Sequence, residues 1–467
     1  MPQTGTGANA ATISLNGTGG PNGAGDVGVY LTSDFAVSSE DGNISITGEG
    51  GGGSFSNDGV LLNGNVTISS TGTTSSAASI TITGTGTAGF SSDGVYFNFG
   101  DSVSSVVGPV QIRGTAGGTR ASGVSFDNNS SVVTTGMAPV VITGTATGRS
   151  SDVNIYGPLG GASATGNFKI EADTIVVGNT ASTAIQSSGT LEIVPRTPTT
   201  TIGLGGGTGT LNLTDSELAK LVDGFSSITI GDTSSGNGDV DIDSVLFNDP
   251  ATIAGGEIHD NASVDIDMAN GDTLTLLGNV SPGQSPGILS VSGNVDLADG
   301  DTFTVEINGT AGPGNAGGHD QLSATGSVDI VGSVTLALLG SPALSGGESF
   351  TIIQRSGGTG TFVGLPDGFM FTDFLGTGLE AEITYTSSAI TIDTIDNTPP
   401  TIAAPPDINV GNDPGQASAV VNYNLPTYSD NAPGATLSQD SGLAPGSVFP
   451  LGPTKNTLTV TDASGKT

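Results

Sequence analysis

The sequence predicts an all-β chain, most of which forms a parallel β-solenoid. Its 467 residues include 77 glycines and 23 prolines, which are poor helix formers, and only 11% are charged. Apolar and polar residues alternate in short segments such as Ile44–Ile46 and Ile80–Ile82, as they do in a strand that buries one face. These segments also recur along the chain, which is typical of stacked repeats.

The repeat is clearest in the N-terminal third. One apolar-x-apolar pattern that closes on glycine is repeated five times, and a second strand precedes each later copy. A unit of about 30 residues cannot bury its own apolar face, so the copies must stack on one another. We expect each closing glycine to turn the chain with a positive φ. The first pattern covers Ile13–Gly17, Ile44–Gly48, Ile80–Gly84, Val110–Gly114 and Val140–Gly144, and the second covers Gly28–Leu31, Gly59–Leu62, Gly94–Phe97 and Gly123–Phe126.

Abundant glycine and serine at low charge is also compatible with disorder. The hydrophobic content of 34% and the alternation of apolar residues favour folded strands instead. The chain contains no cysteine, which fits a large repetitive β-structure whose core grows rung by rung rather than a small disulfide-bonded domain. No apolar run reaches the roughly 18 residues that a membrane-spanning helix needs.

The chain is strongly acidic, with 44 acidic and 9 basic residues and a formal charge of −35. Nucleic acids and anionic membranes are bound through Lys and Arg, so both are excluded as partners. The acidity has two interpretations: it keeps exposed sheet edges soluble, or it binds Ca²⁺. The two histidines, His259 and His319, are far apart in sequence and indicate neither a transition-metal site nor a Ser/His/Asp triad.

After about residue 165 the repeat decays, and the next segments resemble filamentous-haemagglutinin-like adhesins and related bacterial β-strand-repeat proteins. This resemblance implies a right-handed parallel β-helix over residues 1–278. A short helix is expected over Asp215–Asp223, capped by Thr214 or Asp215. The segments that carry the resemblance are Ile193–Pro195, Ile202–Gly206, Gly209–Thr214, Glu217–Leu218 and Gly224–Gly231.

Residues 279–393 resemble the C-terminal β-strand module of autotransporter-like passengers. The resemblance implies a β-rich module that continues or caps the helix and carries no chemistry. The matching pieces are Val280–Gly287, Phe303–Ile307, His319–Leu322, Phe350–Ile353 and Gly360–Phe362.

Residues 394–467 resemble the hyalin-repeat (HYR) domain, which implies an immunoglobulin-like β-sandwich linked to adhesion. Two departures stand out: there is no cysteine pair, and the sequence stops at Thr467 just after the Asp-Ala-Ser-Gly turn. We therefore expect a truncated sandwich and a chain that is part of a longer protein. The matching pieces are Thr394–Pro400, Ala404–Pro406, Ala417–Val421, Tyr428–Asn431, Gly442, Phe449–Gly452 and Thr461–Gly465.

Two glycine-rich motifs resemble catalytic or phosphate-binding loops without meeting their chemistry. Gly283–Gly287 has the pattern of a hydrolase nucleophile elbow, but Pro286 has no N–H to donate to an oxyanion. Ser464–Thr467 resembles the end of a phosphate-binding loop, yet Val460 stands where that loop requires glycine. Both segments are expected to be turns, and the sequence predicts no catalytic residue.

Two groups of aspartates are candidates for Ca²⁺, the one cofactor that the sequence suggests. Asp239, Asp241 and Asp243 alternate along a strand and would share one face, either as ligands or as a solvated surface. Asp396, Asp430 and Asp462 lie at turns near the start of the HYR-like module. The first group would also be the carboxylate cluster of a carbohydrate-active enzyme, but no basic residue lies between Lys220 and Arg355 to stabilise an anionic intermediate.

These observations predict a non-enzymatic, secreted protein of the bacterial cell surface. In this interpretation a stiff solenoid stalk presents loops and an immunoglobulin-like module to a host or neighbouring cell-surface protein or glycan. Two alternatives stay open. One is a polysaccharide lyase or hydrolase built on a β-helix, although the chain has no Trp and 6 Tyr for stacking on sugars. The other is a passive, calcium-stiffened surface-layer component without a receptor.

Overall fold

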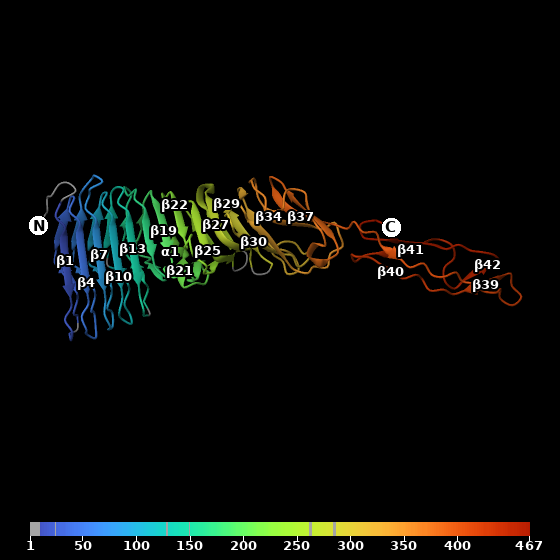
Figure 1. The fold of residues 1–467 in the computed structure, drawn as a ribbon, viewed down its shortest axis with the longest axis horizontal. Coiled ribbons are helices and arrows are strands. Elements are labelled where there is room, and N and C mark those ends of the chain that lie inside the picture. Colours follow the sequence, from blue (N-terminus) through green and yellow to red (C-terminus); the bar gives the residue numbers. More distant parts are fainter. Residues whose placement is uncertain (1–9, 24, 128, 149, 261–263, 284–285) are drawn as a thin grey trace.

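The computed structural model shows an elongated β-structure that narrows into a thin C-terminal module (Figure 1). It describes residues 10–467 except for residues 24, 128, 149, 261–263 and 284–285. The turn expected over Gly283–Gly287 therefore lies partly outside the described residues. Within the described part of the chain, no helix is both long and apolar enough to cross a membrane. The all-β prediction is confirmed.

The body of the rod is a stack of parallel strands, which we call the solenoid (β1 to β34). Its largest sheet joins 17 strands within the described residues and runs along the whole body. These strands are β1 (Ile13–Thr18), β4 (Ile44–Glu49), β7 (Ile80–Thr85), β10 (Val110–Thr115), β13 (Val140–Thr145), β16 (Phe168–Glu171), β19 (Thr190–Val194), β20 (Ile202–Gly205), β21 (Leu211–Thr214), β22 (Ser227–Ile230), β23 (Val240–Ile242), β25 (Ala251–Asp260), β27 (Thr273–Ser281), β29 (Asn294–Leu297), β30 (Thr302–Glu306), β32 (Val328–Ile330) and β33 (Thr335–Leu339).

Two further parallel sheets, each with six strands among the described residues, complete the N-terminal rungs. One contains β2 (Val29–Thr32), β5 (Val60–Asn63), β8 (Val95–Asn98), β11 (Val124–Phe126), β14 (Val153–Ile155) and β17 (Ile175–Val177). The other contains β3 (Ala36–Ser39), β6 (Thr67–Ser70), β9 (Ser102–Ser105), β12 (Ser131–Thr134), β15 (Leu159–Gly160) and β18 (Ile185–Gln186). Each rung is thus three strands joined by corners.

The repeat read from the sequence sets the register of these sheets. Gly17, Gly48, Gly84, Gly114 and Gly144 pair with one another in successive strands. The apolar positions stack in the same way, so Ile46, Ile82 and Ile112 lie directly above one another and are fully buried. The result is a continuous apolar ladder along the axis, which supplies the core that no single repeat can form.

The expected role of the closing glycines was wrong. They lie inside the strands and do not have a positive φ. Instead, the backbone of the next strand approaches them too closely for a side chain. A Cβ at Gly48 would lie 1.9 Å from the carbonyl oxygen of Gly59, and one at Gly114 would lie 1.7 Å from that of Gly123. Glycine is required here for close packing across the inside of the corner.

Buried aspartates connect successive rungs at this corner. Asp58 Oδ1 accepts a hydrogen bond of 2.7 Å from the Asp93 amide, and the Asp93 carboxylate accepts one from the Ser122 amide. Burial, followed by the charge of Asp93, raises the pKa of Asp58 to about 7. Burial likewise raises the pKa of Asp93 to about 6.

The short helix is shorter than expected. α1 covers Asp215–Leu218, and the Glu217 carboxylate accepts hydrogen bonds from the Thr214 amide and hydroxyl at 2.9 and 2.8 Å. The helix ends there because the backbone that follows it pairs with Ile185 instead. The Ile185 amide donates to the Lys220 carbonyl, and the Val222 amide donates to the Ile185 carbonyl. Two 3₁₀ turns lie at Ala269–Gly271 and Phe374–Gly376.

The expected boundary between residues 278 and 279 lies inside β27, and the parallel stacking continues across it to β34. A sheet with eight strands among the described residues then changes direction, because β34 pairs antiparallel with β37 and β36 pairs antiparallel with both β37 and β35. We call β35 to β37 the hairpin cap. The sheet contains β24 (Val245–Phe247), β26 (Val264–Met268), β28 (Ile288–Ser292), β31 (Gln321–Ala324), β34 (Ser349–Gln354), β35 (Phe369–Phe371), β36 (Glu380–Tyr385) and β37 (Ala389–Ile395).

Residues 395–467 form the terminal module, which extends beyond the cap (Figure 1). Its described strands form three separate antiparallel pairs rather than two larger sheets, so the immunoglobulin-like sandwich stays a prediction. The pairs are β38 (Thr401–Ile402) with β40 (Tyr428–Ser429), β39 (Ser418–Val421) with β42 (Ser447–Pro450), and β41 (Thr436–Ser441) with β43 (Thr457–Thr461).

Candidate metal centre

Three aspartates meet where the hairpin cap joins the terminal module. Asp396 directly follows β37, the last strand of the cap, whereas Asp430 directly follows β40 and Asp462 directly follows β43. The three strand ends bring one carboxylate oxygen of each residue within 4.8 Å of the other two. Among the described residues, this is the one group of three or more His, Cys, Asp or Glu side chains with such spacing.

Two of these aspartates are almost fully buried: Asp396 is 2% exposed and Asp462 is 6% exposed. One oxygen of each has an ordinary partner, because the Thr398 amide donates to Asp396 Oδ1 at 3.1 Å and the Lys466 amide donates to Asp462 Oδ1 at 2.7 Å. The other oxygens, Oδ2 of Asp396 and Oδ2 of Asp462, are buried without a hydrogen bond of acceptable geometry. Both oxygens of Asp430 are in the same situation.

The electrostatics of the group are unfavourable as it stands. Burial raises the pKa of Asp430, the Asn431 amide lowers it in part, and the charges of Asp396 and Asp462 raise it again. The nearby Lys466 ammonium donates to the backbone carbonyl of Asp396 rather than to a carboxylate. Buried carboxylates without partners cost free energy, and a cation is the usual way to recover it.

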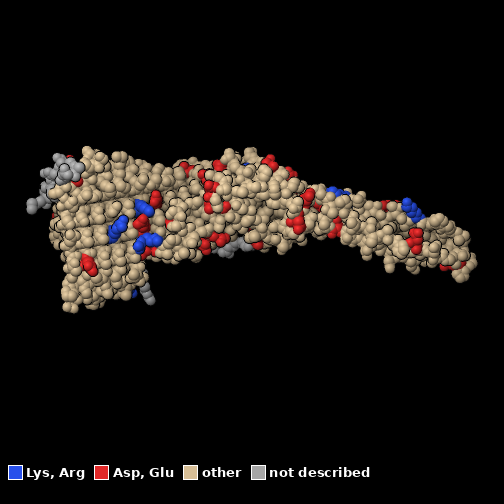
Figure 2. Space-filling model, in the orientation of Figure 1, with Lys and Arg blue, Asp and Glu red and all other residues tan. Residues whose placement is uncertain are grey.

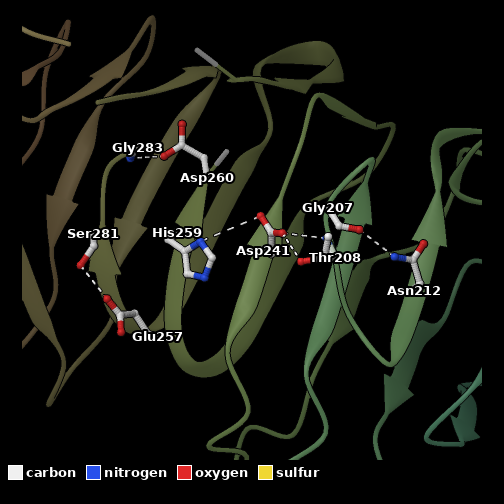
Figure 3. A network of polar contacts seen from close by, with 9 residues as sticks. All are labelled: Gly207, Thr208, Asn212, Asp241, Glu257, His259, Asp260, Ser281 and Gly283. Carbon is white, nitrogen blue, oxygen red and sulfur yellow. Dashed lines mark hydrogen bonds and ion pairs between the residues drawn. The ribbon is translucent and has the colours of Figure 1, made fainter. Parts of the chain in front are cut away.

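The solenoid aspartates have three different environments. Asp241 is buried in β23, and its Oδ2 accepts hydrogen bonds from the Thr208 amide and hydroxyl at 2.7 and 2.6 Å (Figure 3). Asp239 is exposed just before that strand, and Asp243 accepts a bond from the Ser244 amide at 2.7 Å just after it. The structure does not gather the three carboxylates into one group, and calcium binding by them stays a prediction.

The network around Asp241 ties neighbouring rungs together (Figure 3). His259 is the register partner of Asp241 in β25, with its Nδ1 3.9 Å from Asp241 Oδ1. One strand further on, the Ser281 hydroxyl donates to Glu257 at 3.1 Å, and the Gly283 amide donates to Asp260. These contacts run along the solenoid axis and connect neighbouring strands through polar side chains.

An open groove of about 560 Å³ lies on the N-terminal half of the solenoid. It is lined by Asp127, Asn129, Asn154, Tyr156 and Thr180. Burial and the Asp127 charge raise the pKa of the Tyr156 hydroxyl, which therefore stays a neutral hydrogen-bonding group. Among the described residues of this lining, Asp127 is the one carboxylate, whereas glycoside hydrolysis ordinarily uses a pair.

Charge is spread thinly over the surface. On the face shown in Figure 2, acidic side chains are scattered along the rod; several basic ones gather near its N-terminal part, and others lie on the narrow C-terminal part. The three junction aspartates could be identified in the sequence from their turns. Lys466 was not linked to them, because it was considered only as part of a phosphate-loop pattern. Its position four residues after Asp462, in the turn that the two residues close, could have indicated that it lies beside the aspartates.

Comparison with known proteins identifies the terminal module. Neither a search of curated proteins nor one of solved structures gave a match, so the resemblance of residues 1–393 to bacterial adhesins stays a prediction. HYR domains are associated with extracellular proteins of the cell-adhesion type. Residues 395–467 match the HYR domain.

Proposed function

We propose that this chain is a non-enzymatic, structural and adhesive protein of the bacterial cell surface. A stiff solenoid stalk presents the HYR domain and its own loops to partner proteins or glycans on another cell or in the matrix. The observation that carries the proposal is the continuous stack of parallel strands that leads, through one cap, into an HYR domain.

The stack supports a mechanical role. Successive strands are spaced about 4.8 Å apart along the axis, and each is hydrogen-bonded to the next. Bending or shearing the rod therefore strains many backbone bonds and the buried ladder at once. Aromatic stacking adds to the ladder: the rings of Phe97 and Phe126, on adjacent rungs, are 4.6 Å apart and nearly parallel.

The HYR domain offers an apolar contact surface. Val420 and Val448 are cross-strand partners in β39 and β42, and their side chains are 50% and 60% exposed. Exposed apolar side chains that lie next to one another can be buried against a partner protein, and larger patches of this kind mark protein-binding surfaces. We expect these two residues to contribute to adhesion through burial against a partner.

A bead-retention assay tests this function. Beads coated with the full chain are passed over surfaces bearing matrix proteins, cell-surface extracts or glycans. We expect retention by at least one surface, with a several-fold loss for the double variant Val420→Ser, Val448→Ser. Val331→Ser is the matched control, because Val331 is 45% exposed but lies on the solenoid. Absence of retention on every surface favours a passive surface-layer component, and equal loss in both variants excludes this contact surface.

The groove beside Tyr156 is a second candidate contact, for a neutral glycan. An aromatic ring together with Asp, Asn and Thr side chains matches the stacking and hydrogen-bonding needs of a sugar. Tyr156→Ala should reduce retention on glycan surfaces and leave retention on protein surfaces unchanged. Release of shortened sugars from such a surface would instead support the carbohydrate-active alternative.

A further inference from the structure

The acidic group lies at the point where the HYR domain joins the stalk. Asp396 directly follows β37, the last strand of the hairpin cap, and is the second residue of the HYR segment 395–467, whereas Asp430 and Asp462 lie in later loops of the same domain. The same loops already touch the cap, because Asn431 Nδ2 donates to the Gly378 carbonyl at 2.7 Å and Ala432 packs into the solenoid core. Anything that the three carboxylates bind therefore fastens the HYR domain to the stalk.

The geometry fits one metal ion. Two oxygens that each lie about 2.4 Å from a shared calcium ion are at most about 4.8 Å apart, and the three carboxylates meet that limit. The oxygens without hydrogen-bond partners come from all three residues. Buried polar atoms ordinarily have partners, so this concentration of unpaired oxygens in one place indicates a missing ligand rather than a solvated acidic surface.

The donor set selects the kind of ion. Carboxylates are hard ligands that suit Ca²⁺ or Mg²⁺, whereas zinc and copper sites use histidine or cysteine, and this chain has no cysteine. Ca²⁺ tolerates irregular geometry and takes additional carbonyl or water oxygens, while Mg²⁺ demands a near-ideal octahedron. Three loop aspartates from separate segments match the more tolerant ion.

We propose that Asp396, Asp430 and Asp462 bind one Ca²⁺ ion that locks the HYR domain onto the end of the solenoid. With the ion bound, the two units form one rigid body. Without it, repulsion among the carboxylates opposes the contacts of Asn431 and Ala432. The linker Asn397–Pro400, which is already largely exposed, then gains the freedom of motion that a protease needs for cleavage. The site is independent of whatever partner the outer surface of the HYR domain binds.

Calorimetric titration with CaCl₂ of the full chain, stripped by chelator, tests the site. The double variant Asp396→Asn, Asp430→Asn should bind one Ca²⁺ fewer than the native chain. Asp407→Asn is the matched control, an exposed aspartate of the same domain, and should bind as the native chain does. Asn has the same shape as Asp and removes the repulsion between carboxylates, so the double variant should keep the native circular dichroism spectrum. As a second check, the single variant Asp430→Asn should bind Ca²⁺ with an affinity reduced at least 10-fold.

Limited proteolysis of the same proteins measures the lock itself. Cleavage within residues 397–400 should slow at least 10-fold in millimolar Ca²⁺ for the native chain and the control, with no change for the double variant. Equal Ca²⁺ stoichiometry in native and variant chains, or binding of Mg²⁺ in preference to Ca²⁺, would overturn the proposal. Both readouts are independent of adhesion, so a failure here is distinguishable from a failure in the bead assay.

Discussion

The buried aspartate at the rung corner makes the stability of the solenoid depend on pH. Asp58 is 3% exposed, and its carboxyl sits next to Asp93 on the following rung. Its pKa rises from 3.8 to about 7, so the folded chain keeps a proton that the unfolded chain loses. The stabilisation from this proton is complete below about pH 3.8, falls as the pH rises, and is lost above about pH 7.

The size of the effect follows from the two pKa values. They differ by about 3, which corresponds to at most about 4 kcal/mol of unfolding free energy above pH 7. The amide side chain of the Asp58→Asn variant has the shape of the protonated acid, still accepts from the Asp93 amide and carries no charge at any pH. The variant should therefore be more stable than the native chain at pH 8 and nearly equal to it at pH 4.

Thermal unfolding followed by circular dichroism at pH 4 and pH 8 measures this difference. Domains of 150 to 250 residues shift by about 2 to 4 °C per kcal/mol. If half of the maximal effect is realised, about 2 kcal/mol, the midpoint at pH 8 should rise by about 4 to 8 °C. Asp34→Asn, at an exposed corner of the same solenoid, is the control and should change neither midpoint. The same midpoint for Asp58→Asn and the native chain at pH 8 would refute the buried, raised-pKa carboxyl.

Two other substitutions test the packing of the rod. Gly114→Ala places a Cβ 1.7 Å from the Gly123 carbonyl oxygen and should lower the free energy of unfolding in urea by about 1 to 3 kcal/mol. Gly411→Ala is the control and should cost little, because there is open space around Gly411. Equal effects of the two substitutions would disprove the close-packing role of Gly114. Arg355 is buried and donates to the carbonyls of Val328 and Thr386 at 2.9 and 2.8 Å. Arg355→Met should leave these carbonyls unpaired and lower the free energy of unfolding by about 1 to 3 kcal/mol. It should also make β36 more susceptible to proteases. An unchanged cleavage rate would show that the cap does not depend on the hydrogen bonds of Arg355.

The sequence predicts the N-terminal rungs well because one residue spacing determines both burial and register there. Ile82 and Ile112 could be paired in advance, since each lies two residues before a glycine of the same repeat. Beyond residue 165 the strands shorten and their spacing varies, so nothing in the sequence distinguishes the parallel strand β34 from the antiparallel β37 that pairs with it. Pairing direction depends on where the chain returns, which is a property of the whole stack.

The candidate metal centre was partly predictable for a similar reason. Asp396, Asp430 and Asp462 each follow a strand, which marks them as turn residues, but only the folded chain shows that three strand ends meet. Asp241 shows the opposite case. Alternation grouped it with Asp239 and Asp243, yet β23 is only three residues long, so its neighbours lie outside the strand and follow different paths.

Because successive rungs share one register, the length of the rod can change without a change to either of its ends. Because Gly48, Gly84 and Gly114 occupy equivalent positions, the N-terminal rungs present similar upper and lower surfaces to their neighbours. Removing one whole repeat would bring two compatible surfaces together and shorten the rod by about 4.8 Å without opening the core. Gain and loss of repeats can thus adjust the reach of the HYR domain in small, uniform steps, with no redesign of either end.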